Sequence, residues 1–326
     1  MNNLLNKLLL LGLLTLTIGL ANALTPEQQQ AKKQGEILYQ QGLCEKPAPL
    51  LELAAKAGDS ESQYYLGDCI ERLNSMMTKE AAYWFERAAN QGDTYAMMRL
   101  AETDDLCKLL KACGNQNTNE WRTKVQKILV EQANQGNAEA MYQIFLMTRS
   151  LSWLEKSAEA GYPVAQYKLA IRYSEGHGLF ILSSRQEAVD KWMKAAADQN
   201  YPPAMLLWSD RLAQLNKMDE SKTYLLKSAD TGYISGVYSY AASLVYSQIY
   251  PGKTDITGIK EDIPKGFGLL SMLTKIQDPT ARSSLKRLED KVTLEQKKIG
   301  EAYAEEWQKN HPPLSNFREK YLYHSR

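Results

Sequence analysis

Hydrophobic positions recur in one pattern around six positions along the chain, five glycines and one asparagine. The six anchors are Gly58, Gly92, Gly136, Gly161, Asn200 and Gly232. The residues eight and seven before each anchor are large and apolar, and the residue three before it is always alanine. The residue four after it is small, and the residue eight after it is large. Columns in register at this many positions indicate an internal repeat.

Each repeat predicts two antiparallel helices joined at the anchor. The large and small positions before the anchor lie on one helical stripe, and those after it lie on the stripe of a second helix. Glycine and asparagine readily adopt the left-handed conformation that ends a helix. We therefore predict an all-α fold, a right-handed α-solenoid of antiparallel helix-pair repeats. Its predicted repeat core is Trp84, Ala89, Gly92, Trp153, Ala158, Gly161, Gly176, Gly178, Trp192, Ala197 and Gly232.

The pattern divides the chain after residues 1–23 into three parts. About six units occupy residues 24–248, a surface loop follows at 249–264, and residues 265–326 hold a decayed seventh unit, a capping helix and an arm or tail. Short helices are expected at 138–148 and 151–160. Helix N-caps are predicted at Thr25, Thr78, Ser184 and Thr293.

Residues 1–23 have the composition of a secretory signal peptide. Lys7 is the only charged residue before an apolar run, and Ala21-Asn22-Ala23 follows as a cleavage sequence. The run Leu8–Leu20 has 13 residues, whereas a membrane-spanning helix needs ~20. We expect cleavage after Ala23, a periplasmic location in a Gram-negative host, and no membrane insertion afterwards.

Charge argues against two classes of partner, and the cysteine content indicates the compartment. Without Lys7, 38 basic residues stand against 38 acidic ones, which argues against nucleic acid and against an anionic membrane surface. Four cysteines in an exported chain suggest disulfides. Of the three possible pairings we favour Cys44–Cys69 and Cys107–Cys113, because each then stays within neighbouring helices.

No catalytic or metal site is predicted. The three histidines are scattered, there is no C-x-x-C, and recognised nucleophile and nucleotide motifs are absent, so we expect neither enzyme activity nor a cofactor. Ser283 and Lys286 form an S-x-x-K match, but no companion motif follows it.

Three tyrosines stand immediately after repeat anchors: Tyr162, Tyr201 and Tyr233. They fit two interpretations. Each ring packs locally against the helix that follows, as a hydrophobic staple, or the three form a row at the edge of a groove that binds a partner, since tyrosine is enriched at protein interfaces.

The fifth unit resembles the Sel-one-like repeat, a tetratricopeptide-type solenoid unit. Tyr173-Ser174-Glu175-Gly176-His177-Gly178 matches its Y-x-x-G-x-G turn, and Trp192 to Asn200 matches its W-x-x-K-A-A-x-x-G helix. Trp84 to Gly92 and Trp153 to Gly161 match the second half. The resemblance covers about residues 45–245, although most other turns lack the G-x-G.

This resemblance implies a non-enzymatic module that presents a concave groove to another protein. Exported bacterial members include immunity proteins that neutralise toxins, notably phospholipase or lipase effectors of type VI secretion systems, and that role is our leading expectation. The alternatives are an envelope scaffold or regulatory adaptor, and a cysteine-rich repeat protein that binds or hydrolyses β-lactams. The oligomeric state stays open.

Overall fold

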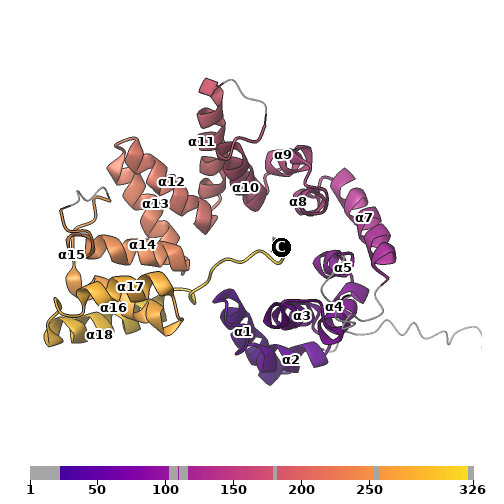
Figure 1. The fold of residues 1–326 in the computed structure, drawn as a ribbon, viewed down its shortest axis with the longest axis horizontal. Coiled ribbons are helices and arrows are strands. Elements are labelled where there is room, and N and C mark those ends of the chain that lie inside the picture. The colour runs from indigo at the N-terminus through magenta and orange to yellow at the C-terminus, as the bar shows by residue number, and fades with distance from the viewer. Residues whose placement is uncertain (1–22, 103–108, 110–116, 179–181, 253–256, 322–326) are drawn as a thin grey trace, which may run out of the picture.

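The computed structural model describes residues 23–102, 109, 117–178, 182–252 and 257–321. These residues hold 17 helices and no strand. The helices stack in pairs around an arc, with the first helix of each pair on the outer rim and the second on the inner rim (Figure 1). The predicted all-α solenoid is confirmed. No helix in the described part of the chain is long and apolar enough to cross a membrane.

A leading helix, α1 (Pro26–Gln40), precedes six pairs. The pairs are α2 (Ala48–Lys56) with α3 (Ser60–Asn74), α4 (Lys79–Asn90) with α5 (Thr94–Leu100), α7 (Thr118–Asn134) with α8 (Ala138–Thr148), α9 (Leu151–Glu159) with α10 (Pro163–Ser174), α11 (Leu182–Asp198) with α12 (Pro202–Gln214), and α13 (Met218–Asp230) with α14 (Ile234–Leu244). The two short helices expected between residues 138 and 160 are α8 and α9.

The anchors end the first helix of each pair in the same way. Gly58 and Gly92 have φ values of 105° and 97°, and even Asn200 adopts 60°. The anchor N–H donates to the carbonyl of the alanine three residues earlier, as from Gly92 to Ala89 at 3.0 Å. The alanine column therefore provides both the close helix packing and the acceptor that ends the helix.

The residue after each anchor is the N-cap of the second helix. In the first three units Asp59, Asp93 and Asn137 accept from the backbone N–H three residues later, at 2.8–2.9 Å. The predicted caps at Thr25, Thr78 and Thr293 are confirmed, and Thr25 and Thr293 form capping boxes. The prediction at Ser184 is wrong, because α11 begins at Leu182 and places Ser184 inside the helix.

Buried glutamines link successive units. The Gln63 side chain donates to the carbonyl that ends its own unit's first helix, and its oxygen accepts from Gln91 of the next unit at 2.8 Å. Gln166 and Gln199 repeat the arrangement at 2.7 Å. Among the described residues only two unit boundaries use this pair, so an alignment of six units does not reveal it.

The stack closes with a further unit and a cap. After the short α15 (Tyr246–Ile249) come α16 (Ile263–Lys275) and α17 (Pro279–Leu288), joined through Gln277 with φ 65°. Gln277 thus occupies the anchor position of the decayed unit, where the six other units have glycine or asparagine. The last helix, α18 (Leu294–Asn310), crosses α16 where Gly268 meets Gly300, backbone against backbone.

The predicted disulfide Cys44–Cys69 is present. It joins the connection after α1 to the buried side of α3, with a Cα–Cα distance of 5.0 Å. The predicted partners Cys107 and Cys113 lie outside the described residues.

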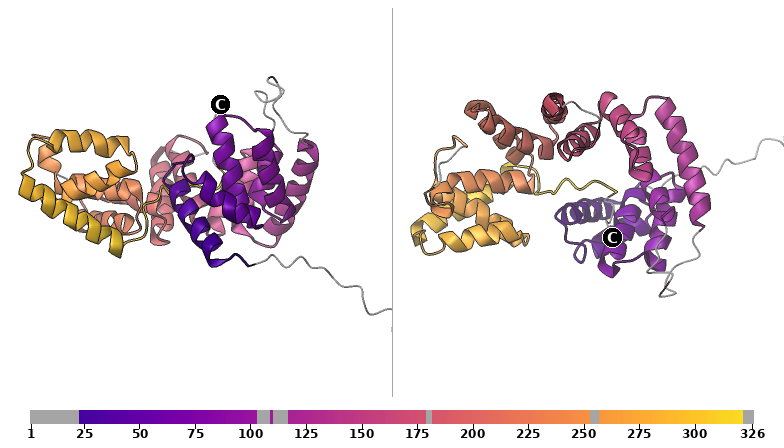
Figure 2. Two further views of the ribbon diagram at one scale, coloured as in Figure 1. Left: turned by 90° about the horizontal axis from the view of Figure 1, so that it is seen from below. Right: turned by 45° about the horizontal axis from the view of Figure 1, so that its top comes forward.

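Residues 311–321, which we name the arm, leave α18 and run without helix along the inner rim. The arm crosses the middle of the arc and reaches the N-terminal helices (Figure 1), and the right-hand view of Figure 2 shows the same course. Its only ladder-type pairing among the described residues is a parallel bridge between Ser315 and Tyr233.

The Gly268–Gly300 crossing predicts a stability effect. A methyl group at Gly268 would overlap the backbone of Gly300, so Gly268→Ala should lower the free energy of unfolding by about 1–3 kcal/mol. Urea unfolding measures this. The exposed neighbour substitution Glu301→Ala should stay within about 0.5 kcal/mol of wild type. Equal stability of Gly268→Ala and wild type would show that the crossing tolerates a side chain.

The disulfide closes a span of 25 residues. In the loop-entropy description, its removal in Cys44→Ala/Cys69→Ala costs about 3 kcal/mol. Urea unfolding of the oxidised wild type, the reduced wild type and the double variant tests this. The last two should agree, and an unchanged midpoint on reduction would contradict the expectation.

Candidate protein-binding groove

The inner helices form a groove that the arm occupies. The N-cap column lines it along most of its length, because Asp93, Tyr162, Tyr201 and Tyr233 all lie next to the arm. The three tyrosines stand where the earlier units have Asp or Asn, and their side chains make no cap bond.

The rings of the three tyrosines contact aromatic side chains outside the helix that follows each of them. Tyr162 packs against Tyr142 of the preceding unit, and Tyr201 against Tyr167, each with ring centroids 5.4 Å apart. The Tyr233 ring meets Phe317 of the arm edge-on at 6.0 Å. All three are half-buried. Tyr162 and Tyr201 also pack against core clusters that include the helices following them, so both interpretations of the sequence stay predictions.

Hydrogen bonds to the arm's main chain do not depend on its sequence. Ser315 exchanges two backbone bonds with the start of α14, accepting from Ile234 at 3.0 Å and donating to Gly232 at 2.9 Å. The side chain of Gln40 both accepts from the Arg318 N–H at 2.8 Å and donates to the Arg318 carbonyl at 3.4 Å. An extended polypeptide of another sequence would meet the same donors and acceptors.

Gly232 has a second role beyond the repeat core. Its φ of 77° ends α13, and a Cβ there would lie 2.7 Å from the Pro313 carbonyl oxygen. Only a glycine lets the arm pass so closely.

The first side-chain site of the arm, the 319 subsite, holds Glu319. The Tyr142 hydroxyl donates to one carboxylate oxygen, and Lys168 Nζ lies 2.9 Å from the other. The two donors come from α8 and α10, so this site bridges the third and fourth units.

The 320 subsite holds Lys320 on the opposite wall. Its ammonium lies 3.6 Å from Glu61 and 3.7 Å from Asp93, and within 5.8 Å of the ring centres of Tyr64 and Tyr65. Carboxylates and aromatic faces both attract a cation.

The 321 subsite holds the Tyr321 ring. Its hydroxyl donates to Glu102, and the guanidinium of Arg99 lies 5.2 Å from the ring centre. Arg99 is 1% exposed and is itself held by Asp68 at 2.6 Å. The ring therefore closes over a buried ionic cluster that reaches to Tyr39 on α1.

Arg318 is less well matched than its neighbours. Its Nε is buried and has no hydrogen-bond partner among the described residues. Burial and the nearby Arg72 lower the pKa of Arg318 from its ordinary value. The groove thus accepts the backbone of residue 318 while solvating its charge poorly.

The arm does not fill the groove. A cavity of about 480 Å³ remains beside it, between arm residues 317–321 and the side chains of Tyr95, Tyr142, Tyr162 and Tyr201. Burial, Glu139 and neighbouring charges raise the pKa of Tyr162 to about 12, so its hydroxyl stays a neutral donor at physiological pH.

The other predicted residues serve the repeat. Trp84 and the alanines Ala89, Ala158 and Ala197 are buried, and Trp153 and Trp192 are half-buried. Gly161, Gly176 and Gly178 have positive φ. Lys156 and Lys191 lie over the rings of Trp153 and Trp192 on the outer rim. None of these residues contributes to the groove.

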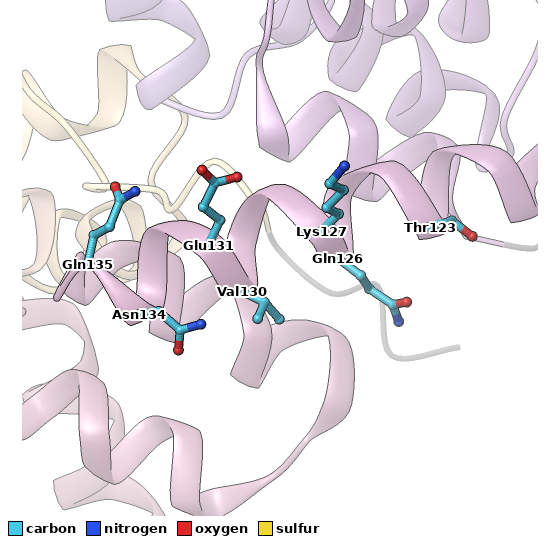
Figure 3. Close-up of a pocket in the computed structure, with 7 residues that line it drawn as sticks. All are labelled: Thr123, Gln126, Lys127, Val130, Glu131, Asn134 and Gln135. Carbon is cyan, nitrogen blue, oxygen red and sulfur yellow. The ribbon is translucent and has the colours of Figure 1, made fainter.

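A second depression lies on the outer rim along α7. Figure 3 shows that its side chains, among them Lys127, Val130 and Asn134, point in different directions from a single helix. No second element of the described chain closes it, so polar groups do not converge there as they do in the groove.

Comparison with known proteins identifies the repeat. The family model of the Sel1 repeat matches residues 60–93, 147–162 and 163–201. These segments of the chain are Sel1-like repeats. Sel1 repeats are protein-interaction units, and the matched segments include α3, α10 and the row members Tyr162 and Tyr201.

Solved structures resemble this chain to different degrees. A protective antigen of uropathogenic Escherichia coli with an SLR fold matches with TM-score 0.50 and 17% identity over 88% of this chain, which spans 62% of that protein. A Sel1 repeat protein from Oxalobacter formigenes matches with TM-score 0.44 and 20% identity, covering 86% and 82% of the two chains. An immunity protein from Pseudomonas aeruginosa matches with TM-score 0.39 and 15% identity, covering 80% and 84%. No curated protein matches the sequence.

The contact of Lys320 with Glu61 predicts a pH dependence of arm docking. Burial alone would raise the pKa of Glu61, but Lys320 and Lys32 bring it below its ordinary value. A lowered pKa in the docked state means that the stabilisation is present above about pH 4.3 and is lost as the pH falls further. We expect faster hydrogen exchange of residues 312–321 at pH 3 than at pH 7, after correction for intrinsic rates.

The control is Glu61→Gln, which removes the carboxylate but keeps the size of the side chain. This variant should show a smaller change over the same window. Identical arm protection at pH 3 and pH 7 in the wild type would contradict the expectation.

Proposed function

We propose that this Sel1-like repeat protein is an exported module that binds a partner protein along its concave groove. The observation that carries the proposal is the arm itself: a non-helical segment already lies in the groove, held through its main chain and through three side-chain subsites. A surface that holds one such segment in this way has the properties of a peptide-recognition site.

The tyrosine row supports the same proposal. An Asp or Asn N-cap stabilises a helix by about 1 kcal/mol relative to a residue that cannot cap. Units four to six lack that bond, although units one to three have it. The loss of a stabilising N-cap bond at three positions on one face is typical of a surface shaped for binding.

We propose further that the partner is a secreted toxin and that the chain is its immunity protein. Support comes from the sequence features of export, the disulfide, which suits an oxidising compartment, and the family resemblance. A phospholipase or lipase effector of a type VI secretion system is the partner class that we would test first.

A competition assay tests this role. Cells that lack the gene should be killed by parental cells with an active type VI apparatus, and the wild-type gene should restore survival. Tyr162→Asp/Tyr201→Asp should not restore it. The variant removes two rings from the groove while supplying the N-cap found in units one to three, so its fold should persist.

The matched control is Tyr83→Asp, which changes a half-exposed tyrosine on the outer helix α4 and should restore survival fully. Full survival of the deletion strain would exclude the immunity role. Full protection by the doubly substituted, normally folded protein would exclude the groove as the binding surface.

A further inference from the structure

Three successive side chains of the arm contact different elements of the groove. Glu319 faces α8 and α10, Lys320 faces α3 and the N-cap residue of α5, and Tyr321 faces α5. The arm backbone is not a regular strand, since Phe317 has a φ of 48° and the chain bends at Lys320, but each of positions 319 to 321 meets a different chemistry.

Three successive positions have complementary partners in the groove. The 319 subsite offers a hydroxyl and an ammonium, the 320 subsite two carboxylates and two ring faces, and the 321 subsite a guanidinium and a carboxylate acceptor. These groups select an acidic, a basic and an aromatic residue in that order.

Two features limit how tightly the arm is held. The Nε atom of the half-buried Arg318 is buried without a hydrogen-bond partner among the described residues, and about 480 Å³ of space beside the arm stays unfilled. A segment with an uncharged residue at that position and larger side chains towards the tyrosines would bury more surface without a desolvated charge.

We propose that the arm is a tethered competitor for the groove, and that the partner inserts in its place a non-helical segment with an acidic, a basic and an aromatic residue in succession. The inference rests on the proposed function, because it assigns the chemistry of the partner's segment. Tethering keeps the arm in place when the partner is absent. Occupation by the arm lowers the apparent affinity for any segment that binds the same subsites.

A peptide-binding experiment on the full chain tests the proposal. The probe is a fluorescent peptide with the sequence of residues 314–321, and the groove is vacated by the arm variant Glu319→Lys/Lys320→Glu, which keeps the net charge. The arm variant should bind the probe at least about tenfold more tightly than the wild type does. A probe with Glu319 and Lys320 exchanged should bind at least about tenfold more weakly than the original probe.

The mismatch at position 318 gives a second readout. A probe that carries Arg318→Gln should bind the arm variant more tightly than the original probe. Added in excess to wild-type protein, it should also speed hydrogen exchange of residues 312–321. Adding Lys168→Glu to the arm variant restores a pair of opposite charges at the 319 subsite, and arm protection should partly recover.

Equal probe affinity of the wild type and the arm variant would overturn the proposal, as would equal binding of the original and exchanged probes. Failure here is distinct from failure of the proposed function. Survival that depends on Tyr162 and Tyr201 without probe binding would refute the competitor role alone. Specific probe binding with full survival of the deletion strain would refute the immunity role alone.

Discussion

A stack of helix pairs buries its core between neighbouring units and leaves its inner rim without a covering layer. In this protein the arm partly supplies that layer. It connects α1, the middle units and α14, which only the curvature of the stack brings to one groove. This one segment lies beside the row of tyrosines, covers the buried cluster around Arg99 and passes close to Gly232.

The fold was predictable because its determinants are local. An anchor, an alanine three residues before it and a cap after it lie within a few residues of one another, so a single unit already displays them. The decayed unit shows the limit of the pattern. Gln277 adopts the left-handed conformation, but a glutamine does not predict that conformation from the sequence.

The groove was predictable only in part, for the opposite reason. Tyr162, Tyr201 and Tyr233 could be found by their position beside the anchors. Their partners could not, because the hydrogen bonds between the arm and the groove join residues 81 to 278 positions apart in the sequence. Neither the mixed composition of residues 317–321 nor the spacing of Tyr142 and Lys168 reveals that these residues meet.

The position of the arm in the chain also fixes an order of events. Every described residue of the groove that the arm contacts precedes it in the chain. The arm can dock only where several units have already stacked, because its partners lie on α1, α3, α8 and α10. Docking of the arm onto Gln40 and Glu61 therefore follows the assembly of the units that it contacts.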